Sequence, residues 1–284
     1  MKITSKSGVW VVGLLMLIVL RGERCGQAQP PVSTSGDAPS RTQETVDGMV
    51  LLPAGVYIPL YSNERGEAQI AIKAFYLDTY AVTNAQYLAF VQTNAQWRRA
   101  RVPRLFADPA YLSHWPSDLP PPEASVAWRH SPVTSVSWFA ARAYCAWQQK
   151  RLPRVAEWEY VALASDRAPD GRHDPAFMSR LLEWYTRPSL SLPPPVGSGA
   201  QNYWGVYDLH GILWEWVADF QTALVTGESR GDGDLERNCG AGMVGTAPQE
   251  RMNYPAFMRY AYRSSLRGTY TISNLGFRCA KDAP

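Results

Sequence analysis

The sequence has little charge and few cysteines, and it lacks the motifs of several common protein classes. Only 19% of its 284 residues are charged, and the formal net charge of +3 comes without a basic stripe, so nucleic-acid binding is not indicated. There is no Gly-rich phosphate loop, no G-x-S-x-G motif and no H-x-x-x-H pair among the four histidines. Nucleotide binding, serine hydrolysis and a histidine-based iron centre therefore have no support.

The N-terminal region indicates export. Val9–Leu20 is an apolar run of 12 residues, which is too short to span a bilayer but typical of a secretory signal. We expect a signal peptide over residues 1–28, cleaved after Ala28. The alternative is an uncleaved anchor, and both place the body of the protein outside the cytoplasm. Gln29–Asp47, rich in Pro, Ser, Thr and Gln, is predicted to be a disordered linker, and residues 48–284 to form one folded domain.

Aromatic residues are abundant, with 11 Trp and 15 Tyr. This surplus fits either a large core or a stacking site for a ring-bearing ligand. The apolar patterns and capping residues predict strands and helices in turn. The predicted strands are Gly48–Leu60, Ile70–Tyr80, Met258–Arg263 and Asn274–Ala280; the predicted helices are Thr83–Asn94, Ser137–Gln149 and Val155–Ala164; the stretches 98–130 and 166–198 are expected to be irregular.

The most unusual stretch is Asn202–Phe220, which holds three Trp, two Tyr and three acids in 19 residues. Asp208 and Glu215 supply two hard oxygens, and carbonyls at a glycine-containing turn could supply more, which is the ligand set that calcium prefers. The alternative interpretation is a Trp-rich core loop whose acids cap helices and face water.

Five blocks of the chain resemble, in order, the motifs of the formylglycine-generating enzyme (sulfatase-modifying factor) family. The resemblance implies a single α+β domain of the C-type-lectin-like type, with short twisted sheets, two or three flanking helices and much irregular backbone. The blocks are M-V-L-L-P-A-G-V-Y-I-P-L (Met49–Leu60), F-Y-L-D-T-Y-A-V-T-N-A-Q-Y-L-A-F-V (Phe75–Val91), Pro132–Ala164 with A-Y-C-A-W and R-L-P-R-V-A-E-W-E-Y, G-V-Y-D-L-H-G-I-L-W-E-W (Gly205–Trp216) and N-L-G-F-R-C-A (Asn274–Ala280).

The resemblance also implies a structural Ca²⁺ and a disulfide. The family's calcium ligands match the Asp208 and Glu215 side chains and the Gly211 and Leu213 carbonyls, at one site. Its disulfide matches Cys145 and Cys279. Cys239 is then left over, as either a small buried hydrophobe or a reactive thiol.

The family's copper site is missing from this sequence. Its two thiolates come from a C-x-x-x-x-C spacing upstream of N-L-G-F-R, and a count back from Asn274 puts Glu250 and Pro255 near those positions. Copper-dependent formylglycine generation is therefore not expected.

In its expected export, its length and its lack of the copper-binding cysteines, the chain resembles the PvdO-like subgroup of this family. That resemblance implies a periplasmic oxidoreductase of siderophore maturation, which oxidises dihydropyoverdine to the pyoverdine chromophore with an unknown redox cofactor. The alternative is a non-catalytic binding or maturation accessory for another exported enzyme, for example in denitrification. The expected partners are a peptide siderophore precursor or a periplasmic protein, with no nucleic acid and no stable membrane span after signal cleavage.

The family's groove position predicts where a substrate would bind. Glu250 is the candidate base and Cys239 the second candidate catalytic residue. Trp214 would stack on the chromophore, while Arg259 and Arg263 would hold acidic groups of the siderophore. The alternative for Arg263 is an ion pair with a core acid.

Overall fold

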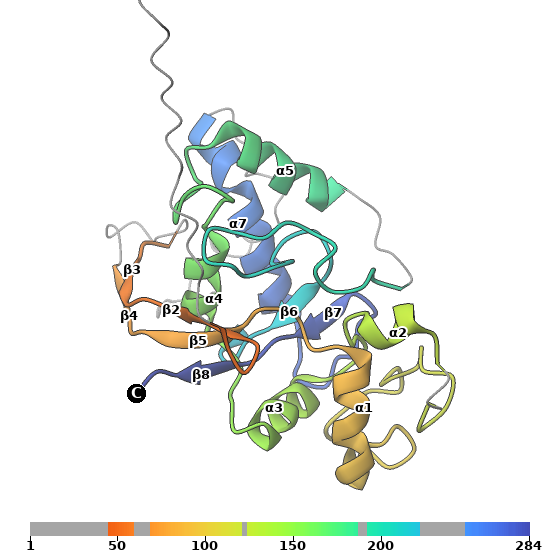
Figure 1. Cartoon of the computed structure of the whole chain (residues 1–284). Coiled ribbons are helices and arrows are strands. Elements are labelled where there is room, and N and C mark those ends of the chain that lie inside the picture. Colours follow the sequence, from red (N-terminus) through yellow and green to blue (C-terminus); the bar gives the residue numbers. More distant parts are fainter. Residues whose placement is uncertain (1–44, 60–68, 121–123, 187–191, 222–247) are drawn as a thin grey trace, which may run out of the picture. The chain divides into compact units, whose positions relative to one another are not determined.

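A four-stranded antiparallel sheet begins the folded part of the chain (Figure 1). The computed structural model describes residues 45–59, 69–120, 124–186, 192–221 and 248–284. The strand order is β1-β2-β5-β8, from β1 (Thr45–Val46), β2 (Met49–Leu52), β5 (Phe75–Asp78) and β8 (Ala280–Asp282). The sheet therefore joins the first described residues to the last.

The hairpin between β1 and β2 turns at Asp47 and Gly48, whose φ angles are 52° and 73°. An Asp-Gly pair with positive φ at both positions is the preferred two-residue turn for a twisted hairpin. The last residues of the predicted linker thus belong to the sheet.

Each of the first two predicted strands is divided in two. Pro53, which has no N–H to donate, follows β2 and separates it from β3 (Gly55–Tyr57). Strand β4 (Ile70–Ile72) pairs antiparallel with β3 and precedes β5.

The predicted helix starts are confirmed. Helix α1 (Asn84–Thr93) begins at a capping box of Thr83 and Gln86, and Ser137 caps α3 (Trp138–Trp147) through the Ala140 N–H. Helix α4 (Val155–Ala162) follows, with its last two predicted residues outside the helix. The short element η1 (Ala95–Trp97) comes just before the 98–130 stretch that was expected to be irregular, and helix α2 (Val126–His130) forms the end of that stretch.

Two predictions of secondary structure are wrong. Met258–Arg263 is not a strand but part of helix α7 (Pro248–Ser265), and the 166–198 stretch contains helix α5 (Pro175–Thr186). The M-R-Y-A-Y-R alternation resembles a strand, but the buried residues Ala256, Arg259, Tyr260 and Arg263 follow helical spacing. The described residues therefore hold six α-helices, more than the two or three expected.

The two most characteristic blocks of the sequence pair directly. Strand β6 (Trp214–Trp216) lies parallel to β7 (Leu275–Phe277), with Glu215 opposite Gly276. A Cβ on Gly276 would lie 2.4 Å from Leu213 Cδ1 and 2.5 Å from the Val133 carbonyl oxygen. Only glycine allows this approach.

The core is rich in aromatic rings packed around Tyr87, Phe90, Tyr144 and Phe277. Beside it, Cys145 in α3 and Cys279 after β7 form the expected disulfide, with Cα atoms 5.6 Å apart across 134 residues of sequence. Among the described helices, none is long and apolar enough to cross a membrane.

The disulfide predicts a measurable stability loss. Replacing both cysteines (Cys145→Ala with Cys279→Ala) should lower the free energy of unfolding by about 4–5 kcal/mol, because the bond closes a long loop in the unfolded chain. Denaturant titration measures this loss. Thiol labelling of the denatured, unreduced protein should modify one cysteine of the mature chain, Cys239, which lies outside the described residues. Labelling of all three, or of none, would contradict this pairing.

Candidate functional site

Arg278 is the centre of a fully buried polar network. Its Nε and Nη2 donate to the Glu215 carboxylate at 2.8–3.0 Å, and both side chains are 0% exposed. Its Nη1 donates to the carbonyls of Asp78 and Thr79, both at 3.2 Å, and Nη2 also donates to the Tyr207 carbonyl at 2.9 Å. One guanidinium thus joins β5, the Tyr207 turn, β6 and the segment after β7.

The carboxylates expected to bind calcium are engaged elsewhere. Besides Arg278, Glu215 accepts the Trp158 indole N–H at 2.7 Å. Asp208 accepts the N–H groups of Gly197 and Gly199, and burial raises its pKa despite these bonds. A guanidinium therefore already supplies the positive charge that these two acids were expected to receive from calcium.

The remaining expected ligands do not change this result. Gly211 has φ of 102° and forms the expected tight turn, while Leu213 is buried. The part of the chain that the structure describes contains no group of three or more His, Cys, Asp and Glu placed to hold a metal ion. In this arrangement the residues do not fit calcium, because Arg278 would repel the ion and occupies Glu215.

Arg259 and Arg263 lie in α7 and both bind Glu159 of α4. The Arg259 fork contacts the carboxylate through Nε at 2.9 and 3.1 Å and through Nη2 at 2.7 Å, and Arg263 Nη1 lies 2.5 Å from it. All three side chains are at least 96% buried. The proposal that these arginines hold substrate acids is therefore corrected: they form the ion pair with a core acid that was the alternative for Arg263.

This cluster carries an excess of positive charge. Burial raises the pKa of Glu159, but the two guanidiniums outweigh it and lower the pKa to about 2, so the carboxylate is ionised at neutral pH. Two cations then face one anion in a buried site. Arg259 also donates to the Tyr185 hydroxyl at 3.1 Å, and Arg263 lies over the Trp158 ring, 4.8 Å from its centroid.

A buried tyrosine pair that no sequence motif indicates lies beside the cluster. The hydroxyls of Tyr57 in β3 and Tyr260 in α7 are 3.0 Å apart. Burial, with Glu159 nearby, raises the pKa of both tyrosines. Helical spacing of Arg259, Tyr260 and Arg263 would have placed Tyr260 near the arginines, but nothing local identifies Tyr57 as its partner.

Aromatic rings of three elements surround Trp214 of β6. Tyr262 of α7 stacks on it at 4.2 Å between ring centroids, while Trp184 and Tyr185 of α5 lie at 5.3 and 5.6 Å. We call these four residues the aromatic box. All four are partly buried, and the Tyr262 hydroxyl is buried without a hydrogen-bond partner in the described structure.

His210 is a packing residue at the edge of this region. Its Nε2 lies 2.9 Å from the Ala162 carbonyl, so this nitrogen carries the hydrogen. The ring contacts Trp158, Phe177 and Trp184. Desolvation, with Arg259 adding to it, lowers its pKa to about 4.

Two candidate catalytic residues are not tested by this geometry. Cys239 lies outside the described residues. Glu250 lies in the first turn of α7, but its side chain is likewise not described.

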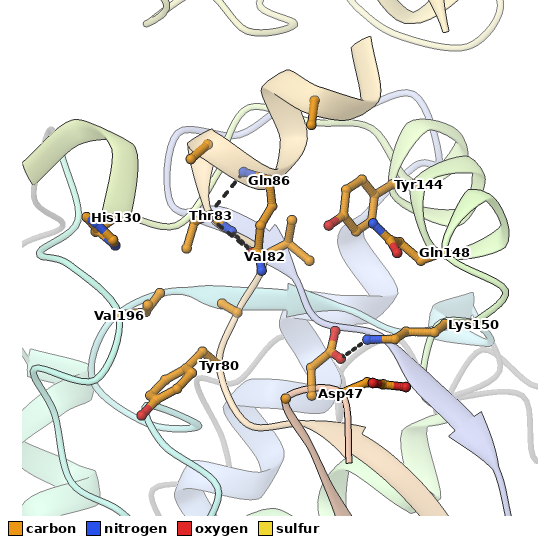
Figure 2. Close-up of a pocket in the computed structure, with 15 residues that line it drawn as sticks. Asp47, Tyr80, Val82, Thr83, Gln86, His130, Tyr144, Gln148, Lys150 and Val196 are labelled. Carbon is orange, nitrogen blue, oxygen red and sulfur yellow. Dashed lines mark hydrogen bonds and ion pairs between the residues drawn. The ribbon is translucent and has the colours of Figure 1, made fainter. Parts of the chain in front are cut away.

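A separate cleft of about 630 Å³ lies beside the start of α1 (Figure 2). Figure 2 shows His130 and Tyr80 on one side of it and Gln148 and Lys150 on the other. Lys150 is 2.6 Å from Asp78, which also accepts the Cys279 N–H. This pair supports the backbone next to the disulfide, so we do not take the cleft as the functional site.

The Glu159 cluster predicts a stability loss that depends on pH. Glu159→Gln should lower the free energy of unfolding by about 3–5 kcal/mol near neutral pH, because it leaves two buried guanidiniums without an anion. The wild-type carboxylate stabilises the fold above its unfolded pKa of about 4.5, and this contribution is lost as pH falls toward 2.

A matched control for this variant is Asp166→Asn, which removes an exposed carboxylate paired with Arg180. It should cost under about 1 kcal/mol at any pH. Chemical denaturation of the three proteins at several pH values measures both effects. Equal losses for the two variants would show that the buried cluster is not stabilising.

Calcium should leave the melting temperature unchanged. Because Arg278 already neutralises Glu215, we expect neither added calcium nor a chelator to shift thermal unfolding of the purified protein. A calcium-dependent rise would show that the ligands implied by the family resemblance displace Arg278.

Known proteins are similar to this chain over most of its length. A family model described as the sulfatase-modifying factor enzyme 1-like domain matches residues 34–283. A formylglycine-generating enzyme of Bos taurus is 29% identical over 90% of this chain and 79% of its own length. An inactive Cα-formylglycine-generating enzyme 2, also of Bos taurus, is 28% identical over 76% and 79% respectively.

Among solved structures, PvdO from Pseudomonas aeruginosa has a TM-score of 0.45 and 19% identity, covering 83% of this chain and 94% of that one. The family model spans nearly the whole chain. On that match, the chain belongs to the sulfatase-modifying factor enzyme 1-like family.

Proposed function

We propose that this protein binds a siderophore precursor through the aromatic box and oxidises its ring, converting a dihydropyoverdine-type chromophore to the aromatic form. The observation that carries the proposal is the partly buried group of four rings around Trp214, contributed by β6, α5 and α7. A flat fused ring is the ligand class that such a group favours.

The aromatic box differs from an ordinary core cluster in two ways. Its rings remain partly exposed, whereas the core rings Tyr87, Phe90 and Phe277 are at most 1% exposed. It also holds the Tyr262 hydroxyl, a buried donor without a partner among the described residues. Because Tyr262 already covers one face of Trp214, a ligand ring would stack at the edge of the box or displace Tyr262.

The charge beneath the box suits an acidic ligand. Arg259 reaches the box through the Tyr185 hydroxyl, and the cluster of Glu159 with two arginines keeps one positive charge in excess. This excess attracts anions by long-range Coulomb interaction without requiring either arginine to leave Glu159. Carboxylates of a peptide siderophore provide the complementary charge.

The proposed reaction removes two electrons and two protons from the dihydro ring, forming one new ring double bond. Dioxygen accepts them and becomes hydrogen peroxide. Glu250, in the first turn of α7, is the proton acceptor in this proposal, with Cys239 as a second candidate. The family's reaction on a substrate cysteine is not proposed, since the segment before N-L-G-F-R contains no copper-binding cysteine pair.

Binding tests the aromatic box directly. Trp214→Ala should weaken binding of purified dihydropyoverdine about tenfold, whereas Trp214→Phe should retain most of it, because a smaller ring still stacks. Trp147→Ala, which removes a partly exposed Trp of α3, is the matched control and should not change the Kd. Fluorescence titration measures the three constants, and equal binding by all of them would refute the proposed site.

Turnover then tests the chemistry. Wild-type protein should convert dihydropyoverdine with one hydrogen peroxide released per chromophore formed, and Glu250→Gln should lower kcat while leaving the Kd unchanged. Binding without turnover would reject the oxidase and retain the site.

A non-catalytic accessory role is the second candidate, and one observation favours it. The carboxylates of Glu159, Glu215 and Asp208 all accept hydrogen bonds, so none of these three is a free base near the aromatic box. An accessory would co-purify with an exported enzyme and leave dihydropyoverdine unchanged.

A further inference from the structure

The loop after α1 presents apolar side chains at the surface beside basic ones. Leu105 is 74% exposed and Phe106 is 37% exposed, although both are large hydrophobic residues. They follow two exposed arginines, Arg101 and Arg104, in the same loop. A single exposed leucine is ordinary on a protein surface. An exposed leucine that lies between arginines and a partly exposed phenylalanine is not.

Tertiary contacts bring two more arginines to this surface. The Phe106 ring packs on Phe139 of α3, with centroids 5.5 Å apart. Arg142, one turn further along α3, lies over the Trp138 ring at 5.4 Å. Arg267 enters from the segment after α7, since Gly268 accepts the Trp138 N–H at 3.0 Å.

We call this set the basic–apolar patch: Leu105, Phe106, Arg101, Arg104, Arg142 and Arg267. In the described structure none of the four guanidiniums makes a hydrogen bond or an ion pair. Two acids of the same stretch of chain, Asp108 and Asp118, already accept backbone N–H groups of Ala110 and Ala100. The four arginines therefore exceed these two acids by two positive charges.

We infer that the basic–apolar patch docks the protein on an anionic lipid surface. Arginines attract acidic headgroups, and the stems of these side chains together with Leu105 and Phe106 enter the boundary between headgroups and acyl chains. This inference goes beyond the proposed function, because the patch shares no residue with the aromatic box. The patch is not visible in the sequence as a basic stripe, because its four arginines come from three separate segments of the chain.

The shape of the patch favours a membrane over an acidic protein as its binding partner. Leu105 projects from an exposed turn and is 74% exposed, while the next residue, Phe106, packs on Phe139 and is only partly exposed. A lipid surface accepts such a projection without a matching pocket. A protein partner would need a pocket for Leu105.

The test is sedimentation of the full chain with vesicles of phosphatidylcholine, with or without phosphatidylglycerol. Wild type should bind the anionic vesicles and release as salt rises. The double variant Arg101→Gln with Arg104→Gln should bind them about 25-fold more weakly, at about fivefold for each arginine. Leu105→Ser should weaken binding several-fold, and because these residues are exposed, the melting temperature should stay unchanged.

Two matched controls test whether a loss of vesicle binding comes from the patch itself. One tests the effect of lower net charge, and the other tests the effect of removing an exposed apolar side chain elsewhere. Lys73→Gln with Lys281→Gln removes the same charge from the connection between β4 and β5 and from β8, where both lysines are exposed. Val126→Ser removes a side chain 73% exposed on α2, at the other end of α1. Neither control should change binding. Equal binding to vesicles without phosphatidylglycerol, equal loss in the controls, or no binding at all would overturn the inference.

Discussion

The Arg278–Glu215 ion pair is the interaction on which the rest of the described structure depends. It is completely buried, and a buried charge is tolerated only when partners satisfy it. Arg278 therefore requires the carbonyls of β5 and the Tyr207 turn to meet at one point, with the glutamate of β6 beside them. Trp158 completes the glutamate's partners. Four segments distant in sequence are positioned by one guanidinium, and the neighbouring disulfide and parallel β6–β7 pairing support the same junction.

The second buried cluster shows how helix α7 is attached. Glu159 lies about a hundred residues before the arginines that neutralise it, and α4 and α7 are joined through this contact. The cluster leaves one positive charge in excess and places α7 so that Tyr262 meets Trp214 and Tyr260 meets Tyr57. The arginines thus act through position and charge, and the aromatic rings that α7 brings to Trp214 form the surface that we propose binds a ligand.

Two regions of the described chain differ in which of their polar groups have partners. The aromatic box combines rings, an unpartnered hydroxyl and nearby positive charge, which suits a flat acidic ligand. The cleft beside α1 is well formed, yet its ion pair of Lys150 and Asp78 holds the backbone beside Cys279. Cavity size alone would select this cleft, whereas our proposal rests on the aromatic box because a polar group there remains unsatisfied.

The sequence by itself determined the family, the capped starts of α1 and α3 and, through the resemblance, the cysteine pair, because these depend on short motifs whose chemistry is local. It could not decide between strand and helix for Met258–Arg263, since that segment alternates like a strand until its buried partners are known. Nor could it show that Glu159 forms ion pairs with Arg259 and Arg263, or that Glu215 pairs with Arg278 where calcium was expected. A buried charged side chain pairs with the groups that lie next to it in three dimensions, and these can be far away in the sequence. Only the tertiary structure therefore decided which of these side chains were already paired.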